Sequence, residues 1–458
     1  MAARRRGTPL HQRTAHAADR AGGDEVTREP DPEVNRAADG GRKRFFAEHA
    51  RRLRREYRQN ADPVTESTHR RGACTETHDG RGHVVHRFGD RDTLLSGRGR
   101  AVATQVADLA LKAYDRPLFT PDEQVDKVLG EVARSGVDVT LGCFHQHVAV
   151  GTDSACTTDE RLVCTVEVSA ETEEGGVCSE VVPWPTALDA AEGGELVARA
   201  ADTVLARRAL PRATDLPEGR DLVLLAGRAG SFFHELVGHP MEADVVASAT
   251  SYLTTRAGRH VAPEWLTVVD GAAGGAGHNY RAVVDDEGMP SRDTLLIEGG
   301  VVREPMTDAA TAALLGVRAT GNGRRLDYRH PAIPRMTHTR ALVADGAVTR
   351  TPDGDWIAPL DLQLLTMNIA TGEFVFRSYT PLHHREDGSV VRLPPVDLHG
   401  QGPRVLAGLE PYDAESKGYG RATKGCGKLG QFPLVVTFAN AGVLLPAGLV
   451  DVREARDG

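Results

Sequence analysis

The sequence has few cysteines and no pair of the C-x-x-C type. The six cysteines of the 458-residue chain are Cys74, Cys143, Cys156, Cys164, Cys178 and Cys426. Their scatter argues against a zinc ribbon, which needs paired thiolates, and indicates a reducing compartment without a disulfide framework. Five of them lie in the N-terminal half, where the simplest interpretation is a small buried hydrophobic side chain.

An excess of positive charge is also missing. The formal net charge is −9, and 26% of the residues are charged. This composition is typical of a soluble globular protein and gives no support to nucleic-acid binding. The length allows two or three domains with hydrophobic cores of their own.

Export and membrane segments are not expected either. MAARRRG resembles the basic start of a signal peptide, but no apolar stretch follows it. Residues 432–450 carry no charge, yet they contain Pro433, Asn440 and Gly442. We therefore predict two buried strands with a turn at residues 440–442, and a cytoplasmic protein that does not enter the membrane.

The residues that can do chemistry lie in SFFHELVGHPMEAD, residues 231–244. His234-Glu235-x-x-x-His239 offers two imidazoles and a carboxylate, which are the ligands and the base that a hydrolytic zinc site needs. In the common H-E-x-x-H motif the histidines are four residues apart, whereas these are five apart. Both reach one metal only if the helical turn is distorted, and Gly238 is where we expect the backbone to yield. The apolar residues 222–226 predict a buried strand that leads into this helix.

Zinc needs a third protein ligand. Cys426 is the preferred candidate, because it lies between Gly425 and Gly427, which permit a close backbone approach. The rivals are four residues that follow the motif: Glu242, Asp244, His260 and His278. Solvated positions at a helix end and in a loop explain these four more simply.

Several motifs occur together in one order. HELVGHPMEAD is followed by VDDEGMPSRDTLLIEGG (284–300), GNGRR (321–325), PAIPRMTHT (331–339) and GCGKLGQ. The chain resembles the TldD/PmbA metallopeptidases, on their metal-bearing, TldD-like side, over roughly residues 65–455. The resemblance implies a zinc peptidase with His234, His239 and Cys426 as ligands and Glu235 as the base. Leu429 and Pro240 depart from the family pattern and put only the fine geometry in question.

The resemblance also implies a partner. Such proteins are dimers, often heterodimers with a metal-free TldD/PmbA relative, and their enclosed site admits unfolded or short peptides. Their substrates include ribosomal peptide precursors. The first alternative is a non-catalytic, metal-containing peptide-binding subunit of a peptide-modifying complex. A second alternative is a metal-dependent amidase that acts on a small peptide natural product.

The pattern of elements predicts an α/β (α+β) fold with mixed sheets and helices. We predict a disordered polar tail over 1–42, a helical and strand region over 43–115, a central α/β domain over 116–210 and a C-terminal zinc metallopeptidase domain over 211–458. Residues 43–59, rich in arginine and helix formers, predict a solvated helix. A second helix is expected over 99–114, a third from a capping box at 120–123 to Gly136, and a fourth over 186–209 interrupted at Gly193-Gly194.

Strand patterns occupy much of the remainder. HVVHRF, DVTLGCFHQHVAV and RLVCTVEVSAE predict strands, and residues 362–379 predict a hairpin that turns at 370–372. An exposed edge of such a hairpin can pair with an extended peptide. His145 and His147 share a strand face, where we expect surface histidines rather than ligands. Arg324, Arg325 and Arg335 could hold a peptide carboxylate or an oxyanion, but structural ion pairs explain them equally well, and they are left out of the catalytic set.

Overall fold

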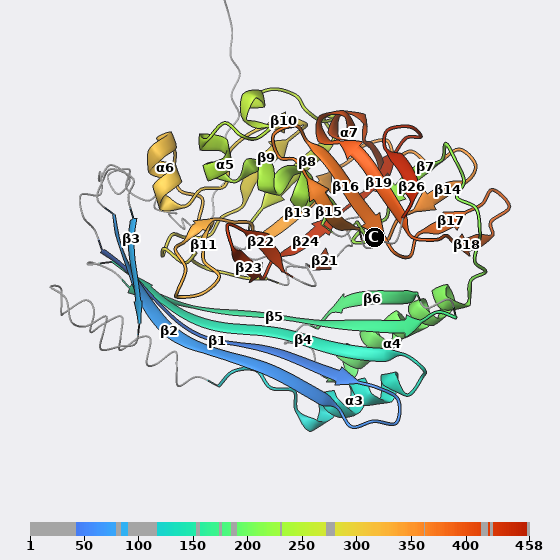
Figure 1. Ribbon diagram of the computed structural model, residues 1–458, viewed down its shortest axis with the longest axis horizontal. Coiled ribbons are helices and arrows are strands. Elements are labelled where there is room, and N and C mark those ends of the chain that lie inside the picture. The colour runs from blue at the N-terminus through green and yellow to red at the C-terminus, as the bar shows by residue number, and fades with distance from the viewer. Residues whose placement is uncertain are drawn as a thin grey trace, which may run out of the picture. The chain divides into compact units, whose positions relative to one another are not determined.

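The computed structural model describes residues 43–78, 84–89, 117–152, 156–173, 176–184, 190–229, 231–271, 280–360, 362–413, 420–421 and 425–455. All of them belong to the compact unit Ala38–Gly458. The predicted tail over 1–42 and the predicted helix over 99–114 lie outside these residues. The described elements form several sheets with few helices, which confirms the mixed α+β fold (Figure 1).

The first sheet is built from long antiparallel strands in the order β3-β2-β1-β4-β5-β6 (Figure 1). Its strands are β1 Lys43–Tyr57, β2 Val64–His78, β3 Val84–Gly89, β4 Asp138–Gly151, β5 Cys156–Glu171 and β6 Val177–Pro183. Helices α3 (Glu123–Ala133) and α4 (Ala190–Ala209) pack on one of its faces around Leu129, Leu141 and Val197. Strands of the predicted 43–115 and 116–210 regions thus share one sheet. The predicted domain boundaries themselves stay a prediction.

The predicted helix over 43–59 is wrong, because these residues form β1. β1 pairs along its length with β2 on one side and β4 on the other. Both of its faces are covered: Leu53 contacts the α3–α4 core, and Phe46 belongs to a cluster on the opposite side. Because both faces are covered, the sequence of β1 shows no alternation of polar and apolar residues. Pairing with two strands outweighs the helix propensity of its arginine, alanine and glutamate residues.

The two helices on this sheet begin and pack differently from the prediction. Helix α3 starts after Asp122, whose side chain accepts from the Val125 N–H, rather than at Thr120. Helix α4 continues through Gly193 and Gly194 without interruption. A Cβ at Gly193 would collide with Trp184, and one at Gly194 with Val128. These glycines therefore allow α4 to approach its neighbours closely.

The C-terminal part contains three larger sheets. One has the order β10-β9-β8-β13-β24-β21: β8 Leu266–Asp270, β9 Thr294–Glu298, β10 Val301–Val302, β13 His338–Val343, β21 Gly420–Arg421 and β24 Thr437–Asn440. The next has the order β18-β17-β14-β7-β25-β20: β7 Asp221–Leu224, β14 Trp356–Ala358, β17 Leu382–His384, β18 Val390–Arg392, β20 Glu410–Asp413 and β25 Gly442–Leu445. The third has the order β15-β16-β19-β26: β15 Gln363–Met367, β16 Glu373–Ser378, β19 Val396–Gln401 and β26 Asp451–Glu454.

Short elements complete this part of the chain. Two small ribbons pair β11 (Gly323–Arg324) with β12 (Ile333–Pro334) and β22 (Cys426–Lys428) with β23 (Gln431–Leu434). The helices are η2 His234–Gly238, η3 His239–Met241, α5 Ala243–Ala247, η4 Thr254–Arg256, α6 Ala309–Leu315 and α7 Gly402–Gly408. A single buried cluster, which includes Phe232, Leu236 and Phe376, joins the sheets around the helical turn at 231–241.

Two strand predictions for the C-terminal part are confirmed. Residues 362–379 form the antiparallel β15–β16 hairpin, and β15 ends its sheet among the described strands. Residues 432–450 contain β24 and β25 on either side of Ala441. These two strands belong to different sheets and do not pair with each other. No described helix combines the length and apolarity needed to cross a bilayer.

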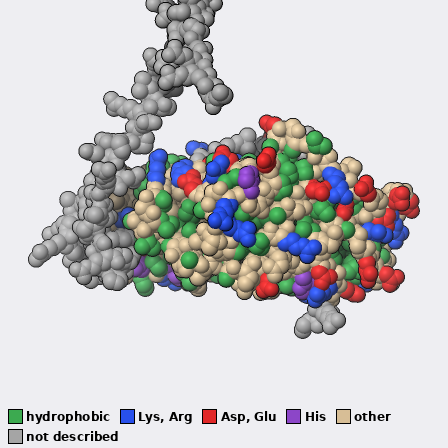
Figure 2. Space-filling model, turned by 90° about the horizontal axis from the view of Figure 1, so that it is seen from above, with side chains coloured by type: hydrophobic (Ala, Val, Ile, Leu, Met, Phe, Trp, Pro, Cys, Tyr) green, Lys and Arg blue, Asp and Glu red, His purple; other side chains and the backbone are tan. Residues whose placement is uncertain are grey.

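Buried ion pairs connect the first sheet with the C-terminal part. Arg161 of β5 lies 2.5 Å from Asp286, and Arg325 lies 3.1 Å from Glu76 of β2. On the face seen in Figure 2, acidic and basic side chains are interspersed rather than gathered by sign. The buried charges that join the two parts are thus partnered.

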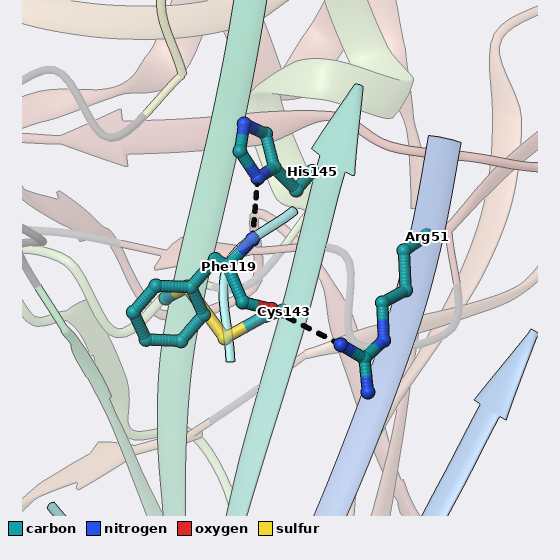
Figure 3. Close-up of a disulfide and its surroundings, with 5 residues drawn as sticks. Arg51, Phe119, Cys143 and His145 are labelled. Atoms are coloured by element: carbon teal, nitrogen blue, oxygen red, sulfur yellow. Dashed lines mark hydrogen bonds between the residues drawn. A yellow bond between two sulfur atoms is a disulfide. The ribbon is translucent and has the colours of Figure 1, made fainter. Parts of the chain in front are cut away.

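The expectation that the cysteines are unpaired is wrong for two of them. Cys143 of β4 and Cys164 of β5 lie directly opposite in the register and form a disulfide. Figure 3 shows this bond behind the Phe119 ring, with His145 farther along β4. The two are 21 residues apart in the sequence, and only the strand register brings them together.

Candidate metal centre

The turn that carries the two motif histidines is a π-helix over His234–Gly238. In it the N–H of His239 donates to the carbonyl of His234, a bond between residues five apart. A π turn widens the helix by one residue, which corrects the mismatch between a five-residue spacing and a regular α-helix. The two rings lie with centroids 5.1 Å apart. The predicted distortion is therefore confirmed.

Gly238 is needed for packing and not, as predicted, because the backbone yields there. Gly238 has φ −58° and ψ −64°, a helical conformation that needs no special freedom of the backbone. A Cβ at this position would instead collide with Sδ of Met336, which is fully buried. Gly238 is thus required for close packing beneath the turn.

Cys426 meets both histidines from the far end of the sequence. It begins β22, and its Sγ lies 3.3 Å from Nε2 of His234 and 3.2 Å from Nε2 of His239. All three candidate ligand atoms lie within 4.8 Å of one another. Around a tetrahedral zinc with ordinary bond lengths, nitrogen and sulfur ligands are about 3.5 Å apart. Since the observed separations are close to this value, the three residues fit a zinc ion.

The charges of these groups support one another. Burial raises the pKa of the Cys426 thiol, but His239 and His234 outweigh burial and hold this pKa well below its ordinary value. Burial lowers the pKa of His239, but Cys426 and Glu242 together raise it well above its ordinary value. A thiolate is the form of cysteine that binds metals, so the surroundings favour the ligand state of Cys426. Binding of a metal to Nε2 of His239 releases the proton that its raised pKa favours.

Glu235 lies at the entrance to this cluster. Its Oε2 is 3.7 Å from Nε2 of His239, and its side chain is 15% exposed. Glu235 and His239 line a cavity of about 510 Å³. The other residues that line it are Glu242, Asp244, Val245, Ser248, Leu364, Met367, Ile369, Gly427, Lys428 and Leu429. A molecule in this cavity would therefore contact both the carboxylate and the metal-binding cluster.

Carboxylates behind the histidines hold the rings in place. Oε2 of the fully buried Glu242 lies 2.9 Å from Nδ1 of His239. Thr339 lies 3.4 Å from Nδ1 of His234, and its hydroxyl donates to Asp270. Such partners fix which nitrogen of an imidazole faces a metal. In the sequence Glu242 stands out only as a rival ligand, and nothing there marks Thr339 or Asp270. The contacts in the fold reveal their positioning roles.

The rival ligands do not join the cluster. Glu242 contacts the nitrogen of His239 that does not face Cys426, and Asp244 forms an ion pair with Lys428 at 2.6 Å. His260 is exposed, and His278 lies outside the described residues. Arg324 and Arg325 donate to neighbouring groups such as Met336 O and Glu76, and Arg335 lies 3.7 Å from Glu242. These arginines are buried and contact groups of the protein, and the cavity beside Glu235 is lined by other residues.

A second group of possible ligands lies on the first sheet. His145 and His147 are buried, so the prediction of surface histidines is wrong, and Glu160 reaches His145 at 3.0 Å. Nδ1 of His145 accepts the N–H of Phe119 at 2.8 Å, as Figure 3 shows. In a neutral imidazole the proton is then on Nε2, where it donates to Glu160 instead of leaving a lone pair for a metal. This arrangement is a hydrogen-bonded cluster.

Comparisons with known proteins point in one direction. Residues 218–425 match the family model of the PmbA/TldA metallopeptidase C-terminal domain. The chain is 33% identical over 194 residues to the "Metalloprotease TldD homolog" of Buchnera aphidicola, which covers 40% of this chain and 38% of that protein. It is 27% identical over 226 residues to the "Zinc metalloprotease TldD homolog" of Saccharolobus solfataricus, with 48% of each chain covered. The matched segments thus span less than half the length of these relatives.

Similarity in structure extends further along the chain. The structure of TldE from Thermococcus kodakarensis superposes with a TM-score of 0.64 at 14% identity, and covers 91% of this chain and 98% of that one. At this identity the likeness shows a shared fold. At 91% coverage the likeness also extends to the first sheet, which the family model over 218–425 leaves uncovered.

Proposed function

Because the chain belongs to the TldD/PmbA family, we propose that it is a zinc-dependent peptidase that hydrolyses peptide bonds in unfolded or short peptides. The observation that carries the proposal is the convergence of His234, His239 and Cys426 beside Glu235. Two imidazoles and one thiolate form a ligand set that zinc accepts, and three protein ligands leave a fourth position open. The relatives named metalloproteases support the same class of activity.

Each residue of the site has a separate task in the proposed reaction. When bound, zinc supplies Lewis acidity toward a water molecule and a peptide carbonyl. Glu235 accepts the proton of the attacking water and later delivers it to the leaving amine. Glu242 and the Thr339–Asp270 pair keep the two imidazoles oriented with Nε2 toward Cys426. The cavity in front of Glu235 holds the substrate.

The shape of the cavity favours an extended peptide. Leu364 and Met367 of β15 line it, and β15 is a terminal strand of its sheet among the described strands. An extended chain can pair with such an edge through its backbone, which gives affinity with little dependence on sequence. A folded domain cannot present a strand in this way. Precursors of ribosomal peptides belong to this substrate class.

The partner and compartment are part of the proposal. We propose a dimer, either of this chain with itself or with a metal-free relative, in the cytoplasm. The fold shared with TldE supports a pair of chains with the same architecture. The C-terminal domain over 211–458 would carry the zinc site, and the regions over 43–115 and 116–210 would form the remainder of each subunit.

A non-catalytic peptide-binding subunit with a metal site is the alternative. The experiment that separates the two is single-turnover cleavage of an unstructured peptide by the zinc-loaded protein and by Glu235→Gln. The proposal expects cleavage that needs zinc and falls on the order of 10²-fold or more in the variant, because the base is lost. Peptide binding without cleavage in both proteins would favour the alternative.

A further inference from the structure

The cavity at the metal centre has an apolar wall. Five of its lining residues are aliphatic or methionine: Val245, Leu364, Ile369, Met367 and Leu429. Leu364 and Met367 come from β15 on either side of a bulge, and both are half-buried against the main core. The bulge breaks the alternation of the strand, so that both side chains face the same way. The wall is thus continuous with the hydrophobic core.

The acidic and basic side chains that line the cavity form ion pairs and hydrogen bonds with one another. Nζ of Lys428 lies 2.6 Å from Asp244 and 3.0 Å from Glu242. Glu242 also contacts His239, and Glu235 lies beside the same imidazole. A charged substrate side chain would have to lose its water and disrupt these pairs to gain a partner here. An apolar side chain meets no such cost.

Leu429 is the most unusual residue of this wall. It directly follows Lys428, in the turn between β22 and β23, and its φ is +48°. A positive φ is unfavourable for a residue with a Cβ, and this side chain is also 76% exposed. The positive φ follows from the two-residue turn that joins the paired Lys428 and Gln431, in which Leu429 and Gly430 both have positive φ. The turn thereby places the exposed leucine side chain at the cavity, where an apolar ligand would cover it.

We propose that this cavity binds an apolar side chain of the substrate on a residue adjacent to the scissile bond, and that Leu429 is a specificity-determining residue. This inference rests on the proposed peptidase activity. It narrows the substrate class from extended peptides in general to peptides that place a leucine-like residue beside the metal. A backbone paired with β15 supplies the position of the chain, and the apolar wall selects which residue lies at the site.

The test uses zinc-loaded protein and a set of unstructured peptides that differ at one residue. That residue is Leu, Ala, Lys or Glu, flanked by glycine, serine and asparagine. We expect kcat/KM for the Leu peptide to exceed that for the Lys and Glu peptides by about tenfold or more, with Ala between them. Mass spectrometry should find the cut bond at the variable residue. Equal rates for the four peptides, or cuts scattered along them, would overturn the inference.

A variant pair isolates Leu429. In Leu429→Asp the preference for Leu over Lys should shrink about tenfold or reverse, because the wall then presents a carboxylate. The control is Leu314→Asp on α6, which changes a 72% exposed leucine outside the cavity and should leave the preference unchanged. An unaltered preference in Leu429→Asp would contradict the role of this residue.

A binding measurement keeps the inference separate from the activity. Fluorescently labelled peptides are titrated with zinc-loaded Glu235→Gln and followed by anisotropy. Tighter binding of the Leu peptide than of the Lys peptide supports the apolar site even if the wild-type protein cleaves neither, a result that would count against the peptidase alone. Equal binding of both would overturn the apolar site while leaving the peptidase proposal intact.

Discussion

Nδ1 of His239 lies 2.9 Å from Oε2 of Glu242, while Nε2 of the same ring lies 3.2 Å from Sγ of Cys426. One imidazole thus joins a buried carboxylate to the thiolate of the candidate metal centre. Because both ring nitrogens are engaged, the ring can neither rotate nor exchange its tautomer without losing a contact. This relationship makes the orientation of His239 a property of the protein before any metal binds.

Glu242→Gln should therefore weaken zinc binding while leaving all three candidate ligands present. We expect the zinc affinity to fall about 10- to 100-fold, because a neutral amide holds the ring less firmly and leaves it a poorer ligand. Competition with a chromophoric chelator measures this change. Asp244→Asn is the matched control, since Asp244 also pairs with Lys428 but does not contact His239. Equal affinities for Glu242→Gln and the wild type would refute the positioning role.

Cys426→Ala should reduce the zinc content from about one ion per chain to a small fraction of that value. Two imidazoles alone leave zinc with only two protein ligands, fewer than either structural or catalytic sites use. Elemental analysis after gel filtration gives the stoichiometry. Cys156→Ala, which changes a free cysteine outside the cluster, should keep its zinc. Full zinc retention in Cys426→Ala would show that another residue, such as Glu242 or Asp244, is the third ligand.

Gly238→Ala should destabilise the protein by about 1–3 kcal/mol, because the new Cβ meets the buried Met336 side chain. The displaced turn should also weaken zinc binding, and adding Met336→Ala should restore zinc binding by making room beneath the turn. Gly130→Ala in α3 is the control, because a Cβ there has open space and should stabilise the helix slightly. Urea unfolding and zinc titration provide the two measurements. A fully stable Gly238→Ala protein would contradict the packing role.

Unfolded proteins should be cleaved and folded ones should resist. The reason is that only an extended chain can reach the edge of β15 and the cavity beside Glu235. One disulfide-containing protein is assayed at equal concentration in its native form and after reduction and unfolding, with products separated by mass. Equal cleavage of the two forms would remove the argument for an enclosed site and weaken that for a dimer.

Acid should destabilise the protein through Asp327. Burial raises the pKa of Asp327, but hydrogen bonds from Arg329 and His330 outweigh it and lower this pKa to about 2. A carboxylate with a folded-state pKa below its unfolded value stabilises the protein above about pH 4, and this stabilisation is lost as the pH falls toward 2. Because the Arg329 partner is exposed and solvent screens the pair, we expect the group to contribute about 1 kcal/mol to the free energy of unfolding at pH 6.

Asp327→Asn should accordingly be less stable than the wild type at pH 6 and nearly equal to it near pH 2. Urea unfolding at several pH values between these limits measures the difference. Asp353→Asn, at a side chain that is 97% exposed, should match the wild type throughout. A constant difference between Asp327→Asn and the wild type across this range would show that the carboxylate is not the acid-sensitive group.

Local patterns in the sequence determined a large part of this protein. The five-residue spacing of His234 and His239 required a distorted turn, and the turn is a π-helix. Alternating residues determined β4, β5 and the β15–β16 hairpin. Such features depend on neighbours within a few residues, so the chain itself displays them. The family resemblance named Cys426 as the third ligand, although spacing alone could not.

Only the tertiary structure decided which distant groups meet. Cys426 lies 192 positions from His234, and only the fold brings its sulfur to the two imidazoles. Residues 43–57 became a strand because β2 and β4 offered both edges a partner, which outweighed their helix propensity. Cys143 and Cys164 were joined by the register of β4 and β5. In each case the deciding contact is long-range, and local sequence carries no record of what will lie across from a residue.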